Sequence, residues 1–234
     1  DFDEALPDYE KYYVAYTLWR EMVYYGPEFI RFVRGIEGVI DSEDSLSVKR
    51  ENIHKRIDNF YKNYVTDIDR GVFDASMETF FENLDPALLN EGLRNVMKKN
   101  DSDYSLIAIS IFEESVFTDK EKVKKWAQEF DGTKESILED PAYKFMTAIY
   151  DLYFDNIRDE YRSVIARLDE IEKKYMTAQM KVLPEEKDYY PNANSTMRVS
   201  YGQVKGYEPR DAIVYEHQTT TEGVLDKYIE LLFS

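Results

Sequence analysis

The stretch from residue 141 to residue 183 constrains the fold most, because apolar residues recur there at alternating steps of three and four. It contains no Gly, and Glu, Lys and Arg occupy many of the other positions. This spacing predicts one helix of about 40 residues, roughly 60 Å long, that ends before Pro184. The predicted stripe consists of Tyr143, Met146, Tyr150, Tyr153, Ile157, Tyr161, Val164, Leu168, Ile171, Tyr175, Ala178 and Val182. Other helices should cover such a stripe.

Shorter amphipathic segments precede the long one and are separated by short breaks such as Gly26-Pro27 and Asp85-Pro86. The predicted helices cover residues 7–25, 27–39, 47–65, 72–84, 86–99, 102–116 and 119–130. Short connections favour antiparallel neighbours, and no fixed-period repeat is present. The predicted fold class is mainly α, an antiparallel helical array packed on one long helix, with a short C-terminal β-containing segment.

The pattern changes after Asn192, where Met197, Val199 and Tyr201 alternate with polar residues as in a strand. Residues 212–216 are a second candidate strand, and residues 219–232 a last helix. We expect residues 197–204 to pair either with 212–216, through a turn at 206–209, or with a neighbouring molecule. The predicted organisation is a helical domain at 1–188 and a strand-containing segment at 189–234.

Composition excludes several classes of function. The 234 residues carry a net charge of -17 and no run of Lys and Arg, which argues against a nucleic-acid partner. No apolar run approaches the roughly 20 residues of a membrane span. Cys is absent, which removes disulfides and thiolate metal sites. The chain opens on Asp1, and we expect it to be a processed or excised piece.

Only two histidines, His54 and His217, are available for a Ser-His-Asp site. His54 lies in a charged helical segment with Asp58 one turn later, which is typical of a surface helix. His217 lies in an extended segment without a flanking Gly-x-Ser-x-Gly motif. We therefore predict no catalytic residue in this chain.

Two acidic stretches resemble metal loops only superficially. Asp101, Asp103 and Ser105 have calcium-loop spacing, but Leu106 replaces the turn glycine and Phe112 replaces the closing Glu. Asp67 and Asp69 before Gly71 fail in the same way, and no Gly-rich phosphate loop is present. We predict no metal site and no cofactor; Asn194-Ser195-Thr196 matches a glycosylation sequon, which matters only in a eukaryotic secretory route.

A C-terminal stretch carries a family resemblance. It reads Tyr190-Pro-Asn-Ala-Asn-Ser-Thr-Met-Arg-Val-Ser-Tyr-Gly-Gln-Val-Lys-Gly-Tyr, followed by Pro209-Arg-Asp and Thr219-Thr-Thr-Glu-Gly-Val-Leu-Asp-Lys-Tyr. This resembles the bacterial serine dipeptidyl-peptidases. The resemblance implies a parent enzyme with a chymotrypsin-like double barrel and a large helical domain inserted over the active site. The preceding helices agree with that family in kind and order.

The same resemblance implies that the catalytic residues lie elsewhere in the parent. In the family, the His and Asp precede the helical insertion, and the Ser follows this region in a Gly-Asn-Ser-Gly setting. The chain would then be the helical cap, inactive alone, of a periplasmic or cell-surface enzyme that acts on peptides, and a homodimer of the parent is compatible with this. The preference at the cleavage site stays open.

The alternative is a non-enzymatic helical binding protein for peptide or carbohydrate. It would use exposed tyrosines with Trp19 or Trp126 as a stacking platform. The parent gene separates the two hypotheses: Gly-Asn-Ser-Gly encoded soon after Ser234 favours the enzyme, and a stop codon at Ser234 favours the binding protein.

Overall fold

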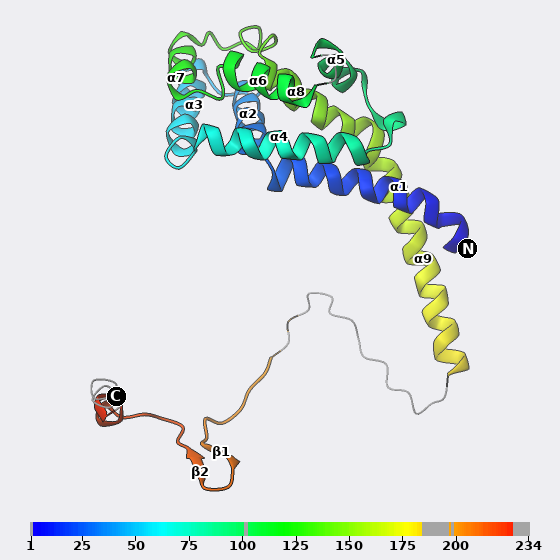
Figure 1. Ribbon diagram of the computed structural model, residues 1–234, viewed down its shortest axis with the longest axis vertical. Helices are drawn as coiled ribbons and strands as arrows, with labels where there is room; N and C mark the ends of the chain where they lie inside the picture. The colour runs from blue at the N-terminus through cyan, green and yellow to red at the C-terminus, as the bar shows by residue number, and fades with distance from the viewer. Residues whose placement is uncertain (1, 101–102, 184–196, 198, 227–234) are drawn as a thin grey trace. The chain divides into compact units, whose positions relative to one another are not determined.

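The computed structural model describes residues 2–100, 103–183, 197 and 199–226 (Figure 1). The chain divides into two compact units, Asp1–Leu183 and Pro184–Ser234. The domain boundary predicted at residue 188 falls within residues 184–196, outside the described part, and stays a prediction. The mainly α fold class is confirmed: helices fill the first unit, and the second contains a two-stranded sheet.

Helices follow one another through the first unit with short connections, as the breaks in the sequence predict. In chain order they are α1 (Phe2–Arg20), η1 (Glu21–Tyr25), α2 (Glu28–Ile40), α3 (Leu46–Phe60), α4 (Thr66–Asn83), η2 (Pro86–Leu88), α5 (Glu91–Lys99), α6 (Tyr104–Ile109), η3 (Ser110–Glu114), α7 (Lys120–Glu129), α8 (Pro141–Asp151), η4 (Leu152–Ile157) and α9 (Arg158–Val182). Of these, η1, η3 and η4 are π-helical and η2 is a 3-10 turn.

The long helix is confirmed, since α8, η4 and α9 form one helical run from Pro141 to Val182. Asp140 caps its start by accepting hydrogen bonds from the backbone N–H of Ala142 at 2.9 Å and of Tyr143 at 3.1 Å. The run contains the π-helical segment η4, which regular spacing did not predict. Because a π turn holds more residues than an α turn, the buried positions step by five there, from Leu152 to Ile157.

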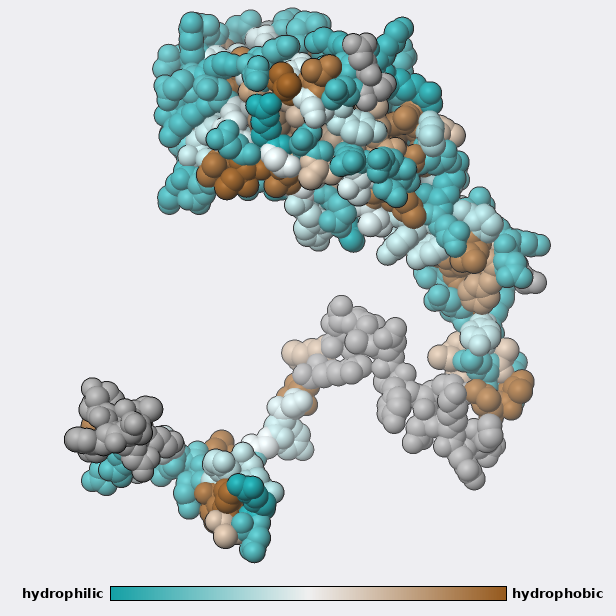
Figure 2. Space-filling model, in the orientation of Figure 1, coloured by the Kyte–Doolittle hydropathy of each residue, from teal (hydrophilic) through white to brown (hydrophobic). Residues whose placement is uncertain are grey.

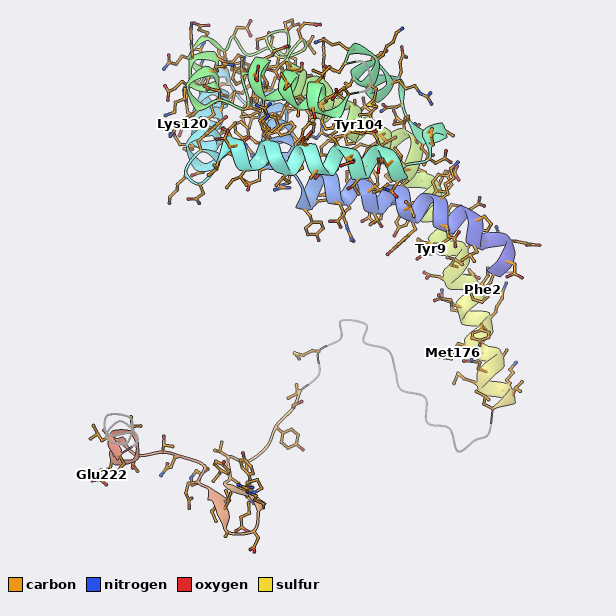
Figure 3. The ribbon with its side chains drawn as sticks, viewed as in Figure 1. Phe2, Tyr9, Tyr104, Lys120, Met176 and Glu222 are labelled. Atoms are coloured by element: carbon orange, nitrogen blue, oxygen red, sulfur yellow. The ribbon has the colours of Figure 1, made fainter. Side chains whose placement is uncertain are left out.

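The distal part of the run contradicts the prediction that other helices cover the whole stripe. α1 packs along α9, and the rings of Tyr16 and Tyr161 stack with centroids 4.4 Å apart. This cover ends at the start of α1, where the Phe2 ring meets the Tyr175 ring edge-on. Tyr175 is 57% exposed and Val182 82% exposed. Hydrophobic residues therefore lie on the surface along distal α9, where Met176 projects (Figures 2 and 3).

The centre of the core is α2, a shorter helix than the one that dominates the sequence. Eight of its 13 residues are buried. Phe29 meets Phe73 of α4 and Phe112 of η3, and Phe32 stacks on Phe60 of α3. The unburied positions, among them Glu28, Arg31 and Gly38, lie on one stripe of α2, and its other faces pack against neighbouring helices of the first unit.

Several helix ends differ from their predicted positions. α1 begins at Phe2, so Pro7 lies inside it, and α4 begins at Thr66 instead of residue 72. The predicted helix at 86–99 is divided into η2 and α5, because the Asn90 side chain accepts from Leu93 N–H and starts a new helix. The predicted helix at 102–116 becomes α6 and η3.

The second unit contains the antiparallel hairpin of β1 (Tyr207–Arg210) and β2 (Ile213–Tyr215). Tyr207 pairs with Tyr215, and their rings stack with centroids 5.1 Å apart. Gly206 is required beside this pair, because an added Cβ would lie 2.4 Å from the Tyr215 carbonyl oxygen. Residues 221–226 are helical, and the rest of the helix predicted to residue 232 lies outside the described part.

The predicted pairing of residues 197–204 with 212–216 is wrong, whereas the alternative pairing with a neighbouring molecule stays a prediction. Residues 197 and 199–204 are not in a strand, and the turn lies at Asp211 and Ala212, not at residues 206–209. Ala212 has a positive φ of 63°, as a tight hairpin turn requires. Pro209 is tolerated inside β1 because each strand of a two-stranded sheet has an open edge, where a missing N–H is harmless.

Candidate functional site

The two histidines do not form a catalytic arrangement in the described part of the chain. His54 is half-buried on α3, and the Asp58 carboxylate lies 3.6 Å from Lys124 Nζ of α7. His217 is exposed in a bend after β2. Among the described residues neither histidine hydrogen-bonds a carboxylate, the contact that would orient a catalytic base.

Two of the acidic candidates, Asp69 and Asp103, are helix caps, and Asp67 is exposed in the first turn of α4. Asp69 is buried in α4 and accepts from Glu28 N–H at 2.6 Å, Phe29 N–H at 3.1 Å and the Tyr64 hydroxyl at 3.0 Å, which caps α2. Burial raises the pKa of Asp69, and these three hydrogen bonds oppose that rise. Asp103 caps α6, while Asp101 and the sequon at 194–196 lie outside the described part. No group of three metal-ligating side chains occurs among the described residues.

A buried charged cluster fixes α8 against α2. Glu37 of α2 is only 6% exposed; its carboxylate accepts from Tyr143 Oη at 2.8 Å and Lys134 Nζ at 3.1 Å, and also bonds Arg34. Burial raises the pKa of Tyr143, and the Glu37 carboxylate raises it further. Burial alone would lower the pKa of Lys134, but hydrogen bonds to Asp41 and Glu37 outweigh it and raise the pKa. These contacts hold three separate segments together.

A groove lies between α5 and α8 in the first unit, and we call it the α5–α8 groove. Its volume is about 540 Å³. Its lining consists of Gly92, Asn95, Val96, Lys99, Leu138, Tyr143, Lys144, Thr147, Ala148 and Asp151. The α5 residues fall at i, i+3, i+4 and i+7, as do four of the α8 residues, so each helix contributes one face.

The two helices of the groove run antiparallel. Asn90 Nδ2, at the start of α5, donates to the Ala148 carbonyl at 2.7 Å. Gly92 lies against Ala148, where an added Cβ would come within 2.8 Å of the Ala148 Cβ. Lys99, at the end of α5, is close enough to Glu139 to lower its pKa. The start of α5 therefore faces the end of α8.

The ends of the α5–α8 groove carry opposite charge. One end has Lys99 and Lys144, and Lys144 also bonds the exposed Glu139. The other end has Asp151, which makes no ion pair or hydrogen bond within the described part of the chain. Burial raises the pKa of Asp151, and repulsion from Asp155 and Glu37 adds to the rise. Arg34 opposes this rise, and the Asp151 side chain is exposed, so a cation at this end would find a negative potential that is only partly offset.

Sequence reasoning missed the α5–α8 groove. The available signal was one small residue on each helix, Gly92 and Ala148, with charged residues at either end of the same faces. These residues indicate a groove only when the two helices are known to be neighbours, and amphipathic spacing does not specify which helices are neighbours.

The tryptophans proposed as a stacking platform are not available for that role. Trp19 is 4% exposed, and its ring stacks on Tyr153 with centroids 4.0 Å apart. Trp126 is half-buried against Phe117 and Phe130 and donates to the Ser136 hydroxyl at 3.1 Å. Both rings pack against core aromatics, so a stacking platform would depend mainly on exposed tyrosines such as Tyr24 and Tyr25.

These observations define an α-helical array with a groove between two helices and an appended hairpin unit. No described helix has a continuous apolar stretch sufficient to traverse a bilayer. The model of the Peptidase S46 family matches residues 2–231, and the chain belongs to this family.

Curated relatives carry dipeptidyl-peptidase names. An Asp/Glu-specific dipeptidyl-peptidase of Flavobacterium psychrophilum is 28% identical over 98% of this chain and 33% of its own length. The protein of that name from Porphyromonas gingivalis is 30% identical over 83% of this chain and 29% of its own length. Dipeptidyl-peptidase 7 of Phocaeicola vulgatus is 25% identical over 97% of this chain and 32% of its own length. The chain thus spans about a third of the length of the curated relatives it matches.

A solved structure supports the fold. The crystal structure of DPP11 from Porphyromonas endodontalis matches with a TM-score of 0.61 at 21% identity, over 96% of this chain and 33% of that chain. The same protein in complex with dipeptide Arg-Asp matches with a TM-score of 0.55. This likeness concerns the arrangement of the helices.

Proposed function

We propose that this chain is the helical cap of a longer serine-type dipeptidyl-peptidase, which releases dipeptides from peptide N-termini. The observation that carries the proposal is the Peptidase S46 match over residues 2–231 in a chain about a third as long as its curated relatives. We assign no catalytic residue, cofactor or metal to the chain. Its peptide partner would reach it through the parent enzyme.

The cap would act by closing over the active-site cleft. A rigid helical array there excludes water and stops a longer chain from threading past, which limits cleavage to the end of the peptide. The charged cluster around Glu37 supports this role, because it ties α2, α8 and the segment containing Lys134 into one rigid unit.

Peptidase activity is tested on the full-length parent and the isolated chain side by side. The parent should release a chromophore from dipeptidyl substrates and lose this activity to a serine-directed inhibitor, while the isolated chain should do neither. Hydrolysis by the isolated chain would overturn the assignment of roles. A substrate panel with acidic and apolar residues before the scissile bond would determine the preference, since one relative is named Asp/Glu-specific and the name of the other states no preference.

The cap role is tested by replacing residues 2–183 in the parent with a short Gly-Ser linker. We expect the variant to cleave N-acetylated peptides at internal bonds, which mass spectrometry of the products detects. Labelling by the serine-directed inhibitor verifies that its active site has formed. A labelled variant that still releases only dipeptides would show that another part of the enzyme restricts access.

The location and assembly of the parent are part of the proposal. We place it in the periplasm or at the cell surface, as a homodimer. Fractionation of cells with an antibody to the parent tests the first point, and light scattering of the purified parent tests the second. Recovery in the cytosolic fraction, or a monomeric mass, would contradict the respective statement.

A further inference from the structure

The α5–α8 groove offers apolar surface between its charged ends. Val96 of α5 and Ala148 of α8 are apolar lining residues, and Ala148 lies between Lys144 and Asp151 on α8. Leu138, which is 45% exposed, precedes α8 and lies at the end with the two lysines. The volume of about 540 Å³ falls in the range of small-ligand sites. An apolar side chain placed beside Val96 and Ala148 would remove apolar surface from water, which is a favourable change.

The opposite charges at the two ends of the α5–α8 groove give a bound molecule a preferred orientation. The whole chain has a net charge of -17, yet Lys99 and Lys144 meet at one end of the groove. Asp151 lies at the other end, without a partner in the described part of the chain. We propose that the α5–α8 groove binds a short peptide with free termini, its carboxylate at the two lysines and its ammonium at Asp151.

Helix geometry sets the length of this peptide. Lys144 and Asp151 are seven residues apart on α8, which corresponds to about 10 Å at 1.5 Å per residue. An extended chain advances about 3.3–3.6 Å per residue, so about three residues span that separation. The ligand is therefore a tripeptide with an apolar residue in its centre.

This inference depends on the groove alone and goes beyond the proposed function. It holds whether or not the parent is a dipeptidyl-peptidase, because the binding is measured on this chain without any turnover. A failed activity assay and a failed binding assay would therefore be separate results.

Isothermal titration calorimetry of the 234-residue chain with Ala-Leu-Ala tests the proposal. N-acetyl-Ala-Leu-Ala lacks the ammonium and Ala-Leu-Ala-amide lacks the carboxylate, and each should bind about tenfold more weakly or worse, since each loses one charge-assisted hydrogen bond. Equal affinity for the free and acetylated peptides would overturn the proposal and reduce the groove to an anion site. Absence of binding by Ala-Leu-Ala would also overturn it.

Variants locate the two ends. Asp151→Asn should weaken Ala-Leu-Ala about tenfold but leave the acetylated peptide unchanged, because the variant and the acetyl group remove the same contact. Lys99→Gln should do the same with the amidated peptide. Glu139→Gln should strengthen binding, because it releases Lys144 from its ion pair.

Matched controls keep this test specific. Asp169→Asn and Lys62→Gln change the same charges at exposed positions outside the groove and should leave affinity unchanged. Circular dichroism verifies that each variant is folded; if one is not, the capped peptides on the unaltered chain still decide the result. Losses in the control variants equal to those of Asp151→Asn would contradict binding in the groove.

The pH dependence provides a readout that a structural role would not produce. The ammonium binds the ionised Asp151 carboxylate, whose pKa is raised by burial and by Asp155 and Glu37, while Arg34 opposes the rise. Affinity should therefore fall as the pH decreases through this raised pKa, before the peptide carboxylate is protonated. The Asp151→Asn variant should lack this dependence, and a dependence unchanged in the variant would contradict the assignment.

Discussion

The proximal and distal parts of the long helical run have similar sequence patterns and opposite surroundings. In the proximal part, Ala142, Phe145, Met146, Ile149 and Leu152 are buried. Within α9, Val164 is the one buried residue, and beyond Ile171 the predicted stripe is exposed. Both parts carry apolar residues at helical spacing, so the pattern alone does not separate them.

The difference teaches that periodicity specifies a helix and its apolar face but not what covers that face. The cover comes from other segments. α2 and α5 pack against α8, whereas α1 is the helix that lies along α9, and it begins at Phe2 (Figure 1). Stability should therefore be concentrated in the proximal part of the run.

Removal of a buried ring from the proximal part should have the largest effect. Phe145→Ala leaves a cavity beside Phe73, whose ring centroid lies 5.0 Å from that of Phe145. The expected loss is about 3–5 kcal/mol of unfolding free energy, measured by denaturant titration.

Phe154→Ala is the matched control, because the same side chain is removed from the same helical run at an exposed position. We expect a loss below about 1 kcal/mol. Equal losses in the two variants would show that the buried and exposed faces of this part of the run do not differ as the structure indicates.

The next effect concerns the contact that anchors α5 to α8. Asn90→Ala removes both the cap on Leu93 N–H, at 2.9 Å, and the hydrogen bond to the Ala148 carbonyl, at 2.7 Å. The expected loss is about 1–2 kcal/mol. Asn90→Asp keeps the cap acceptor and loses the donor, so it should recover part of this loss. Full recovery would mean that the contact with α8 contributes nothing.

Much of the fold could be predicted from the sequence. Gly26-Pro27 and Pro141 mark helix boundaries because proline and glycine act through local backbone geometry. The π segment η4 and the central position of α2 could not be predicted, since both depend on which helices meet. For the same reason the α5–α8 groove was missed.

The hairpin likewise contains one strand that local sequence predicted and one pairing that it did not predict. Strand β2 lies within the predicted 212–216, because Ile213, Val214 and Tyr215 have high strand propensity. Its partner was predicted incorrectly, since pairing depends on a positive φ at Ala212, which a non-glycine residue rarely adopts.

A change in the distal part of the helix should have a smaller effect. Tyr175→Ala removes a half-exposed ring whose edge-on contact with Phe2 has a centroid distance of 6.2 Å. We expect a loss of about 0.5–1 kcal/mol in the same denaturant titration. A loss as large as that of Phe145→Ala would show that distal α9 is covered in solution.

The smallest effect should come from ending the chain at Lys187, because the first unit contains its own core without any residue after Leu183. The unfolding free energy should change by no more than about 0.5 kcal/mol, and thermal melting followed by far-UV circular dichroism should stay cooperative. If the residues after 187 covered distal α9, the truncated chain would lose stability, and Tyr175→Ala would have no further effect in it. Measuring Tyr175→Ala in both chain lengths therefore separates an exposed helix end from one covered by the second unit. Loss of cooperative unfolding would place the second unit within the helical core and show that a boundary near residue 188 is incorrect.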